Sequence, residues 1–147
     1  MRVLQQEKSL LALQCENNLS EWDLLRGQFQ DFLEQESIDS GRIETFLLCA
    51  EEVFTNIIIH AFKGVKEKHP IVIKIWTDPL LVHTEFIDDG MVFVTFSEVI
   101  KNQKQVSLES KPGGLGLWLI KQSTHQFHYE RKSNKNHFYF NLLRKSS

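Results

Sequence analysis

Apolar residues recur along this chain with two different spacings, and blocks of the two kinds alternate. Residues 9–15 form a short, largely apolar run that predicts an edge strand. The apolar residues of 22–33 follow helical spacing, and Ser20 with Asp23 three residues later predicts a capping box before that helix. A second helix is predicted over about 42–62, with an apolar stripe that consists of Leu47, Ala50, Phe54, Ile57, Ile58 and Ala61.

Later segments favour strands. Residues 71–76 are rich in β-branched side chains, and a turn at 77–79 joins them to a strand at 81–87, which together predict a hairpin. Residues 127–131 and 137–143 predict a closing hairpin over a polar turn.

In one long segment between these hairpins the apolar residues show no regular spacing. Residues 97–112 are mostly polar, and a stretch of that length inside a domain is typical of disorder or of a functional lid. We expect a flexible lid at about 97–113, followed by a helix over 114–124. The element order β, α, α, β, β, lid, α, β, β predicts an α+β fold. It is a two-layer sandwich of helices on one face of a mainly antiparallel mixed sheet.

Composition excludes several classes of function. The 147 residues fit one domain, 1–147, and 41% hydrophobic with 24% charged residues is ordinary for a globular protein. A formal net charge of -2 gives no reason to expect a nucleic-acid surface. The two cysteines lack metal-type spacing, and we find no signal peptide and no apolar run of membrane-spanning length. These observations favour a cytoplasmic protein.

The second predicted helix carries the first candidate chemistry. Glu52 and Asn56 lie one turn apart on a face nearly opposite the apolar stripe. A carboxylate and an amide in this arrangement can supply a base and a metal ligand. A polar pair covered by a loop explains this helix alone equally well.

Two loops carry the remaining candidate chemistry. Asp88, in the sequence Asp88-Asp89-Gly90 after a predicted strand, can accept a hydrogen bond from an exocyclic amine such as that of adenine. An Asx-type turn is the alternative, which Asp-Gly favours strongly.

The second loop is rich in glycine and opens a predicted helix. Backbone N–H groups at such a point can hold phosphates, although a flexible hinge is the alternative. No Lys-Ser/Thr pair follows the last glycine, so this is not a Walker A loop. The residues are Gly113, Gly114, Leu115 and Gly116.

The order of these motifs resembles that of the GHKL, or Bergerat-fold, ATPases, which include sensor histidine kinases, gyrase and Hsp90. Residues 52–61 resemble their N box, Asp88-Asp89-Gly90 their adenine-binding G1 box, and 114–117 the G2 box that closes the lid. Within this superfamily the chain is most similar to the bacterial anti-sigma-factor serine/threonine kinases, over about residues 10–145.

Carried over by position, the resemblance implies a site for ATP and Mg²⁺. Asn56 would help to hold the Mg²⁺, and Glu52 would position or deprotonate the attacking hydroxyl group. Asp88 and Gly90 would form the adenine site. The phosphates would be cradled by the main chain of Gly113, Gly114, Leu115 and Gly116.

The resemblance also implies partners. The protein would be an anti-sigma factor that phosphorylates a small anti-anti-sigma (antagonist) protein on serine or threonine in the bacterial cytoplasm, without binding nucleic acid or membrane itself. The family implies a homodimer, for which residues 10–13 are one contact surface, although burial in a strand explains that segment equally well.

Three departures from the family pattern favour an alternative function. Val92 stands where the G1 box usually has a second glycine, residues 93–96 replace a proline-containing stretch, and Asn136-His137 replaces a closing Gly-Thr. The alternative is a catalytically weak or inactive module that sequesters a sigma factor or antagonist. A detached histidine-kinase catalytic domain is the third interpretation.

Overall fold

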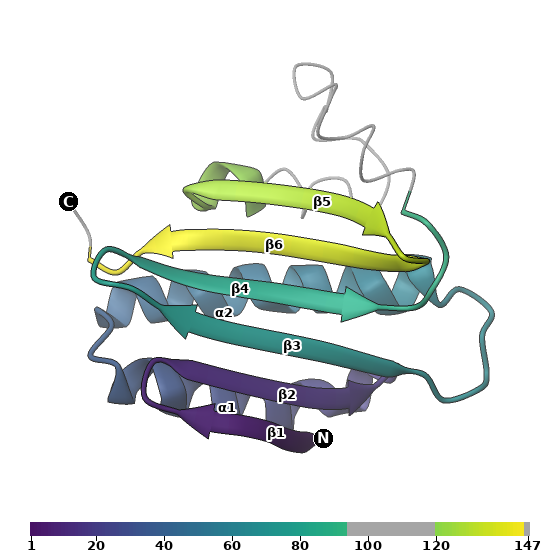
Figure 1. The fold of residues 1–147 in the computed structure, drawn as a ribbon, viewed down its shortest axis with the longest axis horizontal. Coiled ribbons are helices and arrows are strands. Elements are labelled where there is room, and N and C mark those ends of the chain that lie inside the picture. The colour runs from purple at the N-terminus through teal and green to yellow at the C-terminus, as the bar shows by residue number, and fades with distance from the viewer. Residues whose placement is uncertain (94–119, 146–147) are drawn as a thin grey trace.

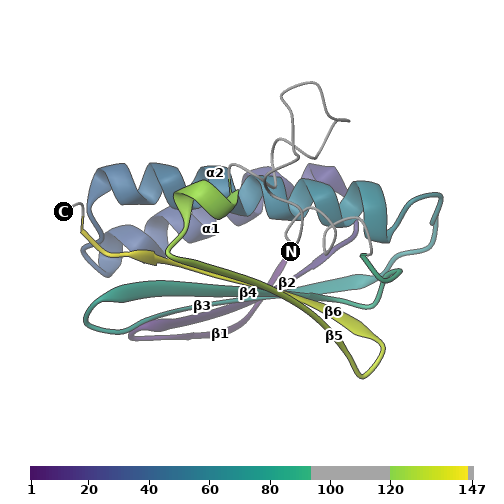
Figure 2. The same ribbon diagram turned by 90° about the horizontal axis from the view of Figure 1, so that it is seen from above.

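Within residues 1–93 and 120–145, which the computed structural model describes, six strands form one sheet and both long helices lie on the same face of it (Figures 1 and 2). The strands are β1 (Arg2–Glu7), β2 (Leu10–Glu16), β3 (Pro70–Thr77), β4 (Leu81–Asp88), β5 (Gln126–Lys132) and β6 (Lys135–Leu143). The helices are η1 (Leu19–Glu21), α1 (Trp22–Gln35), α2 (Ser40–Asn56) and η2 (Ile57–Ala61).

The strand order is β1-β2-β3-β4-β6-β5, and every neighbouring pair among the described strands is antiparallel. The predicted α+β class, with helices on one face of a mainly antiparallel sheet, is therefore confirmed. The register matters for function because it places Asp88 at the end of β4 directly opposite Asn136 at the start of β6.

The core lies between the sheet and the two helices. Side chains on β4 alternate strictly between a buried inner face and a half-buried outer face, as a strand with one covered face requires. Phe46 of α2 packs against Phe140 of β6 with ring centroids 5.5 Å apart, and Phe29 of α1 packs against Phe46. Asp88 occupies an inward-facing position of this same alternation, although it is a carboxylate.

Two predictions about the N-terminal region are wrong. The apolar strand is not at the edge, because β1 pairs with its outer side. Every residue of β1 is exposed, so the segment offered no apolar pattern to detect. The start of the first helix is capped by Asn18, whose Oδ1 accepts a hydrogen bond from the Ser20 N–H at 2.9 Å, and not by the capping box predicted at Ser20 and Asp23.

The other predicted elements are confirmed where the structure describes them. Both hairpins form, and the second helix spans the predicted region, with a π-helical last turn. Of the helix predicted over 114–124, residues 120–123 are described and are helical. The predicted lid at 97–113 and the glycine-rich loop lie outside the described residues. No helix in the described ranges has the length and apolar character needed to cross a membrane.

A polar network lies on the outer face of the sheet, away from the helices. His83 Nε2 lies 2.6 Å from Asp78 Oδ2, and its Nδ1 lies 2.6 Å from the Tyr139 hydroxyl group. Asp78 also closes the β3–β4 turn, because its Oδ1 accepts the N–H groups of Leu80 and Leu81. The hydrogen bond from His83 and these backbone N–H groups lower the pKa of Asp78 from 3.8 to about 2.

We expect Asp78→Asn to flatten the acid side of the stability profile. Because the pKa of Asp78 is lower in the folded chain, its contribution is complete above pH 3.8 and is lost as the pH falls toward about 2. The free energy of unfolding, measured by urea denaturation between pH 5 and about 2, should therefore fall less steeply for the variant than for wild type. If the unfolding free energies of wild type and variant changed equally with pH, the Asp78 carboxylate would not be coupled to folding.

Candidate functional site

The end of α2 carries the predicted carboxylate–amide pair. Asn56 is 3% exposed, and its Nδ2 donates a hydrogen bond to the main-chain oxygen of Glu52 at 2.7 Å. Glu52 is half-buried, and burial together with repulsion from Glu51 raises the pKa of its carboxyl group. The pair is thus on a covered face of the helix, as predicted, with a carboxylate whose basicity is increased.

The helix widens directly after Asn56. Residues Ile57–Ala61 form a single π-helical turn, in which the Phe62 N–H reaches the Ile57 oxygen at 3.3 Å. Such turns occur frequently at functional sites because the extra residue changes which backbone groups remain available. Here the Ala61 oxygen accepts a hydrogen bond from the Met91 N–H at 2.9 Å, in the loop after β4.

That loop begins with the most unusual group of the structure, the carboxylate of Asp88. The residue is 1% exposed. Its Oδ1 accepts hydrogen bonds from the Gly90 N–H at 2.8 Å and from Asn136 Nδ2 at 2.9 Å. Its Oδ2 is buried and has no hydrogen-bond partner among the described residues. Burial raises the pKa of this carboxyl group, although both hydrogen bonds act in the opposite direction.

A buried acceptor without a donor is rare in folded proteins, because leaving it unpaired costs about 1–3 kcal/mol. Asp88 Oδ2 is therefore suited to receive a donor from a bound molecule. An exocyclic amine of a purine is a donor of the required kind.

Gly90 joins the Asp88 loop to the end of the α2–η2 helix. A Cβ atom at this position would lie 2.6 Å from the Ala61 oxygen and 2.8 Å from the Ala61 Cβ. Only glycine allows the loop to approach the π turn so closely. The two predicted motifs are thus brought to the same end of the molecule (Figure 1), linked through Ala61.

Sequence reasoning missed the side chains that hold this loop. Asn136, Tyr129 and Arg131 come from the β5–β6 hairpin, and Asn136 is fully buried. From the sequence alone, Asn136 stands out only as a departure from the family pattern. Its inward position could have been found, because Asn136 stands two residues before Phe138 and four before Phe140 on β6, but its pairing with Asp88 has no local signal.

Four residues predicted to cradle phosphates cannot be placed. Gly113, Gly114, Leu115 and Gly116 lie outside the described ranges, so the phosphate side of the site remains a prediction. The described residues contain no group of three or more His, Cys, Asp or Glu side chains that could hold a metal ion. Asn56, the one predicted metal ligand, is among the described residues.

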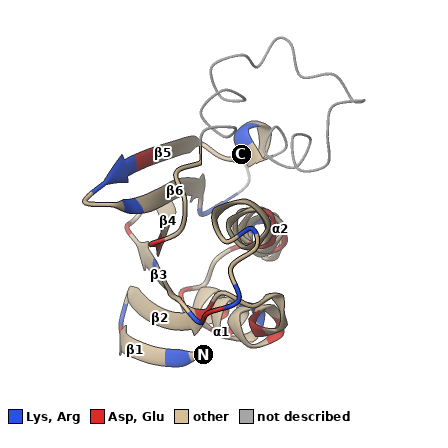
Figure 3. Ribbon diagram, turned by 90° about the vertical axis from the view of Figure 1, so that its right-hand side faces the viewer, with Lys and Arg blue, Asp and Glu red and all other residues tan. Residues whose placement is uncertain are grey.

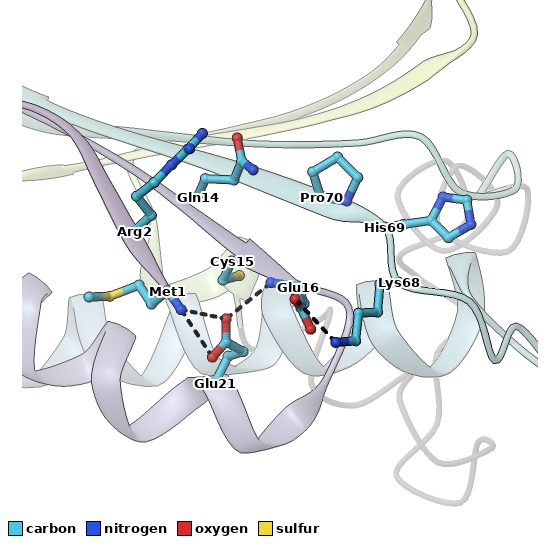
Figure 4. A pocket seen from close by; sticks show the side chains of 9 residues that line it. All are labelled: Met1, Arg2, Gln14, Cys15, Glu16, Glu21, Lys68, His69 and Pro70. Atoms are coloured by element: carbon cyan, nitrogen blue, oxygen red, sulfur yellow. Dashed lines mark hydrogen bonds and ion pairs between the residues drawn. The ribbon is translucent and has the colours of Figure 1, made fainter.

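A cleft of about 420 Å³ lies beside the first residues of the chain and the loop before β3, away from Asp88 and Asn56 (Figure 4). The Met1 ammonium group lies 2.9 Å from Glu21 Oε2, and Glu21 also accepts the Glu16 N–H. Cys15 lines this cleft, but burial raises the pKa of its thiol to about 12, which leaves it unreactive near neutral pH. Of the predicted site residues that the structure describes, none lines this cleft.

The fold indicates a class of protein. An antiparallel sheet covered by helices on one face is the arrangement expected of a histidine kinase-like ATPase domain. The family model for the histidine kinase-like ATPase domain matches residues 15–141, and the chain belongs to that family.

The structure also resembles a solved one, the crystal structure of the RsbU and RsbW domains of Rv1364c from Mycobacterium tuberculosis. The TM-score is 0.60 and the sequence identity 14%, and the match covers 90% of this chain and 32% of the other. No curated protein matches the sequence. The resemblance to the histidine kinase-like ATPases is confirmed by the family match, and the solved structure shares the fold.

We expect Gly90→Ala to destabilise the chain by about 1–3 kcal/mol, because the added methyl group overlaps the Ala61 backbone. Chemical denaturation measures the change. Gly27→Ala is the matched control, since Gly27 is exposed in the middle of α1 and a Cβ there meets no atom within 4 Å. This control should stabilise the helix by about 0.5–1 kcal/mol. Equal effects of the two variants would contradict the close contact of Gly90.

Proposed function

We propose that this chain is an ATP-dependent protein kinase that transfers a phosphoryl group to a serine or threonine hydroxyl. The single observation that carries the proposal is the buried, unpartnered Oδ2 of Asp88 beside the Asn56 helix. Membership of the histidine kinase-like ATPase family supports ATP as the nucleotide.

The described residues fit the adenine end of ATP. Asp88 Oδ2 accepts the 6-amino group, and the loop around Gly90 is fixed against Ala61 so that this acceptor does not move when the nucleotide enters. Burial excludes water, which increases the strength of this hydrogen bond. The nucleotide with its Mg²⁺ supplies the phosphoryl group and neutralises its charge.

Glu52 and Asn56 serve the other end of the reaction. Asn56 helps to hold Mg²⁺, and the carboxylate of Glu52 orients the acceptor hydroxyl group or takes its proton. The raised pKa of Glu52 supports this role, because a more basic carboxylate takes a proton more readily. In this proposal the main chain of 113–116 cradles the phosphates and the lid at about 97–113 closes over them.

The acceptor is a small anti-anti-sigma (antagonist) protein, and the chain holds a sigma factor, as a homodimer in the bacterial cytoplasm. The sequence motifs that resemble anti-sigma-factor kinases support this role. The structural similarity to a protein whose solved part is described as RsbU and RsbW domains supports it further.

One observation favours a second candidate, a module that binds its partner without catalysis. Val92 replaces a glycine, and the adjoining Met91 is held at both its N–H and its oxygen by Ala61 and Asn136. A loop fixed in this way opposes the closing of a lid. An ATP titration in the presence of Mg²⁺ tests the kinase, because no measurable ATP affinity would remove it, and in the binding module the nucleotide is absent or structural.

We expect Glu52→Gln to reduce phosphoryl transfer by about 10²–10⁴-fold while ATP affinity stays close to wild type, because the amide cannot accept a proton. Labelled ATP and candidate antagonist proteins provide the transfer assay, and calorimetric titration provides the affinity. Glu44→Gln is the matched control, since Glu44 is exposed on the same helix and does not contribute to the raised pKa of Glu52. If Glu52→Gln and Glu44→Gln transferred the phosphoryl group at the same rate, Glu52 would have no part in the reaction.

The chemical nature of the product gives an independent prediction. Phosphoserine and phosphothreonine are stable in acid, whereas phosphohistidine is not, so the labelled product should survive acid treatment. Loss of the label in acid would instead identify a detached histidine-kinase catalytic domain. The measurement is the fraction of label that remains on the protein after incubation at low pH.

A further inference from the structure

The strand β1 forms one edge of the sheet (Figure 1). Its outer side faces no other strand of the described chain, so the backbone N–H and C=O groups on that side are open to pairing. All six of its residues are exposed, and the exposed fractions of Val3 and Leu4 are 41% and 43%. Because β1 covers the outer side of residues 10–13, which the sequence offered as a dimer contact, pairing at this edge must use β1 itself.

A bulge interrupts β1. Val3 lies opposite Leu13 of β2, but Gln5 lies opposite the adjacent residue, Ala12, so Leu4 is an extra residue in the strand. Side chains of a regular strand alternate between the two faces of the sheet, and one extra residue reverses that alternation for the residues that follow it. Two residues of β1 that lie an odd number of positions apart can therefore share a face when Leu4 stands between them.

The bulge brings the two charged residues of β1 to one face. Arg2 lies opposite Gln14 and Glu7 lies opposite Leu10, and both of these β2 residues are on its outer face. Arg2 and Glu7 are five positions apart, so without the extra residue they would face opposite sides of the sheet. The strand thus carries a positive charge at its start and a negative charge at its end, both on the face away from the helices.

Both charges are free to meet a second molecule. The Arg2 side chain has no hydrogen-bond or ion-pair partner among the described residues. Within the same part of the chain Glu7 has no ion-pair partner, and its Oε1 accepts a hydrogen bond from Gln5 Nε2 at 3.1 Å. When two such strands run antiparallel about a two-fold axis, the start of each lies opposite the end of the other. The charge pattern of β1 is consequently complementary to itself.

We propose that two copies of this chain dimerise through β1, with the strands paired antiparallel and Arg2 of each copy opposite Glu7 of the partner subunit. This inference rests on the proposed function, in which the chain is a homodimer, and names the surface that holds the dimer together. Strand pairing satisfies the open backbone groups of the edge, and each Arg–Glu pair adds a cross-strand contact. Because the outer faces of the two strands coincide, the helices of both copies lie on the same side of one continuous sheet, as they do within each copy (Figure 2).

Charge reversal tests the pairing, with the dimer dissociation constant of the full chain measured by sedimentation equilibrium. Wild type should be dimeric. Arg2→Glu or Glu7→Arg should each raise the dissociation constant about tenfold, because like charges then face each other at both ends of the strand pair. The chain with both substitutions regains two opposite-charge pairs in reversed order, so its dissociation constant should return close to the wild-type value. A double variant that associates as weakly as the single ones would overturn the Arg2–Glu7 pairing.

Lys132→Glu provides the matched control. It makes the same charge change as Arg2→Glu, at an exposed position on β5, which forms the opposite edge of the sheet. Its dissociation constant should equal that of wild type. An increase as large as that of Arg2→Glu would show that net charge controls association, and would overturn the proposal. Thermal unfolding of each variant checks that the chain is folded at the temperature of the measurement.

Disulfide cross-linking tests the register independently of charge. The proposed pairing places Val3 opposite Gln6 of the partner subunit, and opposite residues of antiparallel strands have Cα atoms about 4.5–5.5 Å apart, which a disulfide can span. Within one chain the two positions lie about 10 Å apart, which is too far. Under oxidation, Val3→Cys with Gln6→Cys should give a covalent dimer on a non-reducing gel, and either single variant should give much less. Equal yields would overturn the register. The native Cys15 and Cys49 are buried and should not compete.

Failure of this inference is distinguishable from failure of the proposed function. If wild type is a dimer whose association is insensitive to both charge reversals, β1 is refuted as the contact and the homodimer stands. If wild type is a monomer, the β1 contact and the homodimer both fall. In either case the ATP titration and the transfer assay decide the kinase activity separately.

Discussion

The burial of one carboxylate, Asp88, constrains much of the structure at this end of the sheet. Its position at the end of β4 is an inward-facing one, on the same face as the buried Phe86. Burying an acid costs free energy unless its oxygens are hydrogen-bonded, and Gly90 and Asn136 satisfy one of the two. The unsatisfied oxygen is the feature on which the functional interpretation depends.

The groups that support Asp88 also hold the chain that follows it. The Gly90 oxygen, both backbone groups of Met91 and the Phe93 N–H are all hydrogen-bonded, to Arg131, Ala61, Asn136 and Tyr129. One set of contacts therefore positions the carboxylate and fixes the backbone up to residue 93. The basic end of β5 (blue in Figure 3) lies on the hairpin that provides three of these side chains. This end is not merely solvated, because Arg131 donates a hydrogen bond to the Gly90 oxygen.

The sequence predicts the fold well because periodicity reports burial directly. The α2 stripe and the β3–β4 and β5–β6 hairpins were all visible as apolar patterns, and the motif order located Glu52, Asn56 and Asp88. The exposed β1 and the cap at Asn18 were not visible, since neither depends on an apolar pattern. The role of Asn136 was hidden for a different reason. It arises from the β4–β6 register, a pairing between distant segments that no local pattern encodes.

That same pairing affects the order in which contacts form as the chain folds. Asn136 lies 48 residues beyond Asp88, and the intervening loop must close before their hydrogen bond forms. Closing a loop of this length has an entropic cost, which makes such contacts late in folding. A chain still on the ribosome, with β4 formed but β6 not yet emerged, has both long helices and the first four strands, but its Asp88 carboxylate lacks the Asn136 donor. A partly synthesised chain would therefore not bind nucleotide, and binding would begin only once folding is complete.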